Sequence, residues 1–213
     1  MIERSYYNTS AKDFVAADEQ TILGALTGRS SFAVDPQQRD AWVYTIKHLQ
    51  GVLPRFDGAH VFLEFTIPRM GRRVDAIVIY RGILFVLEYK VGEADFSTSA
   101  IDQAVGYALD LKNFHEASHD RTIVPIVVAT RAADHAYEFT LAPDGVAGPL
   151  CTNGQQLAHL IRECASRWEG SLLDGHEWSR GRYKPTPTII EAAQALYVKH
   201  DVLEISRSEA GAE

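Results

Sequence analysis

Apolar positions in the first third of the chain recur at helical spacing. Residues 11–26 show this spacing after a hydroxyl at Thr9 or Ser10 that can cap a helix, which predicts a first helix. A second helix is expected to begin at Pro36, because proline is favoured in the first turn, and to end before Pro54. The N-terminal third is therefore predicted to be helical.

The spacing of apolar residues then becomes that of strands. Residues 61–67, 74–80 and 83–90 are rich in β-branched and aromatic side chains, which predicts three strands. Only Arg81 and Gly82 separate the last two strands. A connection this short predicts an antiparallel hairpin.

The second half alternates helices and strands. A long helix is predicted over residues 99–117, and the run 123–130 is apolar on both faces, which is typical of a buried parallel strand. A weaker strand over 146–152, a helix over 154–168 and a last helix over 186–198 follow. The predicted class is α/β, with a mixed sheet flanked by helices and with helical extensions at both ends of the chain.

Composition places the chain among ordinary globular proteins. It has 213 residues, of which 46% are hydrophobic and 23% charged, which excludes disordered and collagen-like classes. Cys151 and Cys164 are the two cysteines, which disfavours a disulfide scaffold. No apolar run approaches the ~20 residues that span a bilayer, and the N-terminus has no apolar signal core, so we expect a cytoplasmic protein without membrane contact.

Net charge limits how the chain would bind nucleic acid. The formal charge is −7 at pH 7, which disfavours a protein that coats nucleic acid nonspecifically through many lysines and arginines. It does not exclude a nuclease, since metal-dependent nucleases need carboxylates at their centre.

Three charged residues interrupt strands that are otherwise apolar. Asp75 lies within VDAIVIY, and Glu88 and Lys90 end ILFVLEYK. Residues two apart on a strand share a face, so Glu88 and Lys90 are expected on the face of Leu84 and Val86, with Asp75 brought near by the hairpin. Buried charges cost several kcal/mol each unless they are paired or bind a metal.

A buried carboxylate–lysine pair, or a strand end in water, would explain any one of these residues alone. The combination favours a site for Mg²⁺, with Mn²⁺ as a substitute, because such ions prefer carboxylate oxygens. In that hypothesis Asp75 and Glu88 hold the ion, and Lys90 positions a water or stabilises developing charge.

Asp75 followed by Glu88-Tyr89-Lys90 resembles the motif of the PD-(D/E)XK nuclease superfamily, which includes restriction endonucleases, Holliday junction resolvases and RecB-type nuclease domains. The chain departs from the motif in lacking a proline before Asp75. The resemblance implies a restriction-endonuclease-like mixed sheet with an αβββαβ core. It also implies metal-dependent hydrolysis of phosphodiester bonds in DNA or RNA.

Two further features are similar to members of this superfamily. Gln103-x-x-x-Tyr107 resembles the Q-x-x-x-Y motif of RecB-like members, which implies that Gln103 lies near the metal and Tyr107 near the nucleic-acid backbone. Members often supply another carboxylate, here Glu64 or Glu19. Packing and solvent-facing roles for these four residues stay open as alternatives.

Basic residues near the motif are candidates for contacts to phosphates. Arg69, Arg72 and Arg73 flank the turn before Asp75, and Lys112 lies on the helix that carries Gln103-x-x-x-Tyr107. Arginines are also common at surface turns, so both interpretations remain open here.

Longer stretches, among them IPRMGRRVDAIVIY, LEYKVG and YKPTPTIIEAAQALY, resemble the N-terminal region of the bacterial Schlafen-group DNA/RNA helicases. In that family a nuclease-like domain precedes a helicase motor, whose GxxxxGK[ST] motif this sequence lacks. The resemblance implies a helicase partner in cis or trans and a role in DNA repair or anti-phage defence. It suggests three parts: helices over 1–54, a nuclease core over 55–170 and a helical tail over 171–213.

Other functions remain open on the same residues. The fold could bind nucleic acid or a helicase without cutting, or it could be a protein-interaction domain. The amphipathic C-terminal helix could dock on the core or form a homodimer. DNA is favoured over RNA as the partner. The sequence does not specify whether that nucleic acid is single-stranded or double-stranded.

Overall fold

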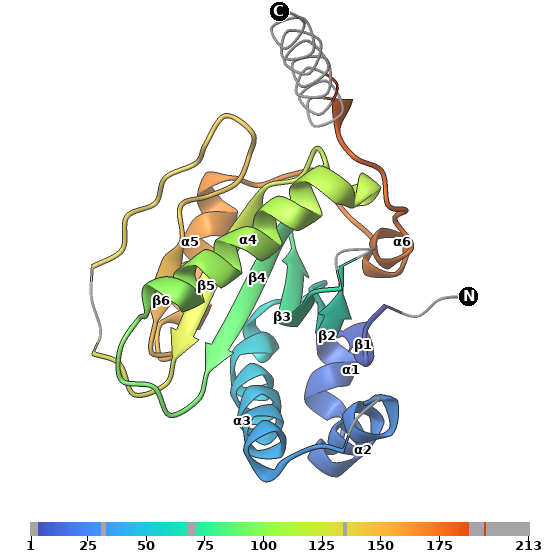
Figure 1. Ribbon diagram of the computed structural model, residues 1–213, viewed down its shortest axis with the longest axis vertical. Coiled ribbons are helices and arrows are strands. Elements are labelled where there is room, and N and C mark those ends of the chain that lie inside the picture. Colours follow the sequence, from blue (N-terminus) through green and yellow to red (C-terminus); the bar gives the residue numbers. More distant parts are fainter. Residues whose placement is uncertain (1–3, 31–32, 68–70, 134–135, 188–193, 195–213) are drawn as a thin grey trace, which may run out of the picture.

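The computed structural model describes residues 4–30, 33–67, 71–133, 136–187 and 194. Six strands form one mixed sheet in the order β1-β2-β3-β4-β5-β6 (Figure 1). The strands are β1 (Tyr7–Ser10), β2 (His60–Thr66), β3 (Arg73–Tyr80), β4 (Ile83–Lys90), β5 (Ile123–Ala129) and β6 (Leu150–Thr152).

The first four strands are antiparallel, and the turn between β3 and β4 is the predicted hairpin. Arg81 and Gly82 both have positive φ, at 49° and 74°, as two-residue hairpin turns of the favoured type require. A Cβ on Gly82 would also lie 2.3 Å from the Ser171 carbonyl oxygen, so the close approach of that segment requires glycine as well.

Strand β5 is parallel to β4, and β6 is parallel to β5. The helix α4 (Thr98–Phe114) connects β4 to β5 and crosses one face of the sheet (Figure 1). All seven residues of β5 are buried, which confirms the prediction of a covered parallel strand at Ile123–Ala129.

Helices cover both faces of the sheet. The described residues form six α-helices, and besides α4 they are α1 (Ala11–Ala16), α2 (Glu19–Arg29), α3 (Pro36–Val52), α5 (Leu157–Arg167) and α6 (Gly175–Ser179), with short 3₁₀ turns η1 (Leu53–Arg55) and η2 (Glu116–Ser118). Apolar side chains of α1, α2, α3 and α5 form one core with the sheet, and those of α4 and α6 form a second core on its other face. No described helix is long and apolar enough to cross a membrane.

The single helix predicted over residues 11–26 is wrong. Ser10 caps α1 through a hydrogen bond from the Asp13 N–H, and α1 ends after one and a half turns. Asp18 then starts α2 by accepting a hydrogen bond from the Thr21 N–H at 3.2 Å. Two capping residues within nine positions favour two short helices over one long helix.

Two other differences concern residues 7–10 and 175–179. Residues 7–10 pair with β2 as an edge strand, so the N-terminal 54 residues contribute to the sheet as well as to its helical cover. The short helix α6 lies in a segment expected to be irregular. The predicted C-terminal helix over 186–198 lies mostly outside the described residues.

The core on the α4 side contains two buried histidines. His115 Nδ1 lies 2.7 Å from Ser118 Oγ, which also accepts a hydrogen bond from Trp178 Nε1 at 2.9 Å. Burial lowers the pKa of His115 to about 3. Burial, followed by the neighbouring charge of His176, lowers the pKa of His60 to about 4.

Acid is therefore expected to destabilise the fold. A histidine whose pKa is lower in the folded than in the unfolded chain contributes stability above pH 6.5 that is lost as the pH falls toward its folded pKa. From pH 7 to pH 5 the loss is about 2 kcal/mol for each histidine. Urea unfolding at several pH values measures it. The free energy of unfolding plotted against pH should have a shallower slope in His115→Asn than in the wild type. The control His159→Asn, on the exposed side of α5, should keep the wild-type slope. Equal slopes in all three proteins would contradict the assignment.

Candidate functional site

Asp75 and Glu88 lie where β3 and β4 separate. The regular pairing of the hairpin ends at Ala76 and Leu87, one residue before this pair. Asp75 Oδ2 accepts a hydrogen bond from the Tyr89 N–H at 2.8 Å, so a carboxylate takes the place of a main-chain partner. The interruption of the ladder places the two carboxylates side by side on neighbouring strands.

Lys90 connects β4 to α4 through a chain of polar contacts. Its Nζ lies 2.9 Å from Glu88 Oε1 and 3.2 Å from Gln103 Oε1. Gln103 Nε2 in turn donates to the Tyr107 hydroxyl at 2.8 Å. The structure thus brings together four predicted site residues, because alternate residues of β4 face α4 and one helical turn separates Gln103 from Tyr107.

Burial of the two carboxylates of this cluster is costly. Burial, and next the charge of Glu88, raise the pKa of Asp75 well above its ordinary value. Burial also raises the pKa of Glu88, although the hydrogen bond from Lys90 opposes this. Glu88 Oε2 is buried and has no hydrogen-bond partner among the described residues. Such an unpaired buried acceptor is costly unless it binds a ligand.

Lys90 is charged in this setting. Burial alone would lower its pKa, but the hydrogen bond from its ammonium to Glu88 and the charges of Glu88 and Asp75 outweigh burial and raise the pKa above the ordinary value. The ammonium therefore acts as a hydrogen-bond donor and positive charge rather than as a base at neutral pH.

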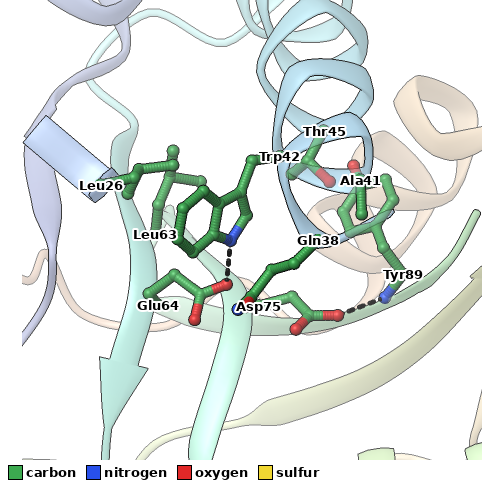
Figure 2. Close-up of a pocket in the computed structure, with 9 residues that line it drawn as sticks. All are labelled: Leu26, Gln38, Ala41, Trp42, Thr45, Leu63, Glu64, Asp75 and Tyr89. Carbon is green, nitrogen blue, oxygen red and sulfur yellow. Dashed lines mark hydrogen bonds between the residues drawn. The ribbon is translucent and has the colours of Figure 1, made fainter. Parts of the chain in front are cut away.

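A pocket of about 110 Å³ opens beside Asp75 on the side of α3. Figure 2 shows the indole of Trp42 pointing to Glu64, and Gln38 reaching from α3 toward Asp75. Trp42 Nε1 donates to Glu64 Oε1 at 2.7 Å. The other walls of the pocket are mainly apolar. The pocket therefore has the aromatic rings of Trp42 and Tyr89 beside the Asp75 carboxylate.

Glu64 occupies an irregular position in β2. Its φ is 54°, uncommon for a residue other than glycine, and it interrupts the β2–β3 pairing opposite Asp75. Leu63 packs in the core on the α3 side, whereas Phe65 packs in the core on the α4 side, although residues two apart in a regular strand share a face. The irregularity turns Glu64 toward Trp42.

A third metal ligand is not in place. Among the described residues no group of three His, Cys, Asp or Glu side chains lies close enough to hold a metal ion. Glu64 is buried and forms an ion pair with Arg73, which together with Trp42 occupies its carboxylate. Glu19, the other candidate, pairs with Lys47 at 3.3 Å on the helical layer. The prediction of Glu64 as a ligand is not supported by this arrangement.

Two predicted phosphate contacts are engaged within the fold. Besides Glu64, Arg73 binds the Tyr6 hydroxyl at 2.6 Å, and its guanidinium lies over the Tyr6 ring. Lys112 is buried and donates to the Arg121 carbonyl at 2.8 Å, nine residues along α4 from Gln103. Lys112 therefore already has a partner within the fold, and its contact to nucleic acid stays a prediction.

Arg72 remains at the rim of the site. Its Nη1 lies 3.3 Å from Asp110 Oδ2 and passes over Gly106, next to Tyr107 on α4. Its side chain is 54% exposed, so the guanidinium is open to a ligand from solvent. Arg69 lies outside the described residues.

The site has a support from the α3 side that the sequence did not indicate. His48 Nδ1 lies 2.9 Å from the Tyr89 hydroxyl, and His48 Nε2 lies 3.0 Å from the Gly154 carbonyl oxygen. Since a carbonyl only accepts, Nε2 donates and Nδ1 accepts from Tyr89. Burial lowers the pKa of His48, in keeping with this neutral form. These bonds hold Tyr89, whose N–H binds Asp75.

Comparisons with protein-family models, with curated proteins and with solved structures found no match for this chain. The functional argument therefore depends on the residues of the site.

Proposed function

We propose that this protein is a metal-dependent nuclease that hydrolyses phosphodiester bonds, and that its mixed sheet is a restriction-endonuclease-like core. The observation that carries the proposal is the convergence of Asp75, Glu88 and Lys90 at the break between β3 and β4, with Gln103 bound to Lys90. Buried like charges at the end of a strand pair are costly for stability and are typical of catalytic sites.

The residues present fit Mg²⁺ or Mn²⁺. Asp75 and Glu88 supply two carboxylates, and Glu88 Oε2 is an acceptor without a partner. Mg²⁺ is commonly held by one or two carboxylates, with waters and substrate phosphate completing its shell, so a third protein ligand is not required. When bound, such an ion acidifies a water and neutralises charge on the phosphate.

Lys90 would stabilise charge that develops on the scissile phosphate. Its ammonium is fixed by Glu88 and Gln103 before any substrate arrives, and preorganised donors of this kind need little reorganisation during the reaction. Gln103 positions Lys90, and Tyr107 positions Gln103. Arg72, at the rim, would contact a flanking phosphate.

Cleavage of circular single-stranded DNA and supercoiled duplex DNA tests the proposal, and RNA is tested in parallel as a third substrate. We expect cutting in Mg²⁺ or Mn²⁺, none in EDTA, and none by Glu88→Ala, because that variant loses a metal ligand. The matched control Glu163→Ala changes a partly exposed glutamate of α5 and should cut at the normal rate.

The result that would overturn the proposal is a wild-type protein that cuts neither these substrates nor linear DNA. Cutting that persists in folded Glu88→Ala would also contradict the assigned site. Metal-independent binding of the same nucleic acids without any cutting would instead identify a non-catalytic binding module.

A further inference from the structure

A groove of about 550 Å³ lies away from the carboxylates, between α3 with η1 and the first half of α5. These helices pack on the same face of the sheet, the one opposite α4 (Figure 1). Polar and charged side chains line both walls of the groove. Those on the α3 and η1 wall are Lys47, His48 and Arg55, and those on the α5 wall are Gln155, His159 and Arg162.

The charge of the groove is opposite to that of the whole chain. Three arginines and lysines line it, and its lining contains no aspartate or glutamate, although the chain carries a net charge of −7. Lys47, Arg55 and Arg162 are all exposed. Among the described residues, Arg162 has no hydrogen-bond or ion-pair partner, whereas Arg55 donates to the Gly51 carbonyl at 2.7 Å and Lys47 pairs with Glu19. The excess positive charge is therefore local and open to solvent.

The floor of the groove leaves room for a bulky anion. Gly51 lies between Lys47 and Arg55 on one side of α3 and η1, and a Cβ there would meet no atom within 4 Å. The start of α5 forms the opposite wall, and its first residue lacks a side-chain cap, since Gln156 makes no capping hydrogen bond. An uncapped helix start adds to the positive potential that the three side chains create.

A chain of hydrogen bonds connects the groove to one residue of the candidate active site. His48 lines it and also binds the Tyr89 hydroxyl, and the Tyr89 N–H binds Asp75. His48 thus connects the groove to the residue that binds Asp75, whereas Glu88 and Lys90 lie on the other face of the sheet, toward α4.

We propose that this groove binds the phosphodiester backbone of nucleic acid through Lys47, Arg55 and Arg162. The proposal rests on the proposed nuclease function for the identity of its ligand. Repeating phosphates suit a row of exposed cations from two helices, and such contacts position a strand without reading its sequence. In an acidic protein, one local groove of this kind can supply the affinity that net charge does not.

The test is binding of a fluorescein-labelled DNA oligonucleotide, single-stranded and duplex, measured by fluorescence anisotropy at several salt concentrations. Ca²⁺ replaces Mg²⁺ to limit cleavage. The double variant Arg55→Gln/Arg162→Gln removes two groove charges. The matched control Arg180→Gln/Arg182→Gln removes two exposed charges at the end of α6 and beyond, on the other side of the sheet.

We expect the groove variant to bind at least tenfold more weakly than the wild type. Its plot of log affinity against log salt should be shallower by about 1 to 2, because each lost phosphate contact removes about 0.7–0.9 from the slope. The control should keep both the affinity and the slope of the wild type.

Equal affinity and slope in the groove variant and the control would overturn the proposal, as would a wild-type protein that binds neither oligonucleotide. Competition by poly-glutamate as strong as that by unlabelled DNA would also overturn it and identify an acidic polypeptide as the ligand. Groove-dependent binding without cleavage would support the groove and refute the nuclease. Normal cleavage and unchanged binding by the groove variant would support the nuclease function and refute the groove.

Discussion

Replacing Lys90 by methionine is expected to lower the rate of metal-dependent cleavage about 10²–10³-fold, the usual effect of removing one preorganised donor from an active site. Methionine keeps most of the length and apolar contact of lysine but removes its ammonium. Because this ammonium contacts Glu88 and Gln103 in the free protein, its loss removes transition-state stabilisation without removing a metal ligand. The loss should therefore appear in kcat, with KM nearly unchanged.

Single-turnover cleavage separates this effect from substrate binding. Oligonucleotide binding in Ca²⁺ should stay close to that of the wild type, whereas the thermal melting temperature should fall, because the buried Glu88 carboxylate loses its ion-pair partner. The control Lys12→Met removes an exposed lysine of α1 and should cut normally. A folded Lys90→Met protein with the wild-type rate would show that the ammonium has only a structural role.

Replacing Arg73 by methionine is expected to destabilise the protein by about 2–3 kcal/mol. The variant leaves the buried Glu64 carboxylate without its ion-pair partner, and breaking such a pair typically costs about 3–5 kcal/mol when both members are buried. The smaller figure allows for the 38% exposure of the Arg73 side chain, since solvent weakens partly exposed pairs. Urea unfolding at neutral pH measures the change.

A second substitution identifies the cause of this loss. In the double variant Arg73→Met/Glu64→Gln no unpaired charge remains, and the glutamine can still accept the hydrogen bond from Trp42. We therefore expect most of the lost stability to return. If Arg73→Met were as stable as the wild type but bound oligonucleotides more weakly, Arg73 would be the phosphate contact that its sequence position suggests.

Most elements that carry the candidate site follow from local patterns. The hairpin of β3 and β4 was predictable because Arg81-Gly82 permits only a tight turn, and β5 because it is apolar on both faces. The alternation of β4 placed Glu88 and Lys90 on one face, and helical spacing did the same for Gln103 and Tyr107. These rules need no knowledge of distant segments, so the Glu88–Lys90 and Gln103–Tyr107 pairs could be anticipated. The contact between Lys90 and Gln103 joins a strand to a helix and depends on tertiary packing.

Other features depended on contacts between distant parts of the chain. No local pattern marks the break at Glu64, where a positive φ reverses the expected face of β2 and brings the carboxylate to Trp42, 22 residues earlier in the chain. The sequence suggests that Arg73 and Lys112 are surface cations. In the structure Arg73 instead binds Glu64 and Tyr6, and Lys112 donates a hydrogen bond to the Arg121 carbonyl.

The sequence alone therefore determined the strands from β2 to β6, the helices α3, α4 and α5, and the residue types of the candidate site, because each depends on spacing along one segment. The tertiary structure alone decided which charged side chains remain available to a ligand. That outcome depends on which acceptors other segments bring within reach, as the contrast between buried Lys112 and exposed Arg162 shows. A charged side chain is available to an ion or a phosphate where it stays exposed, or keeps an unpaired atom, after the chain has folded.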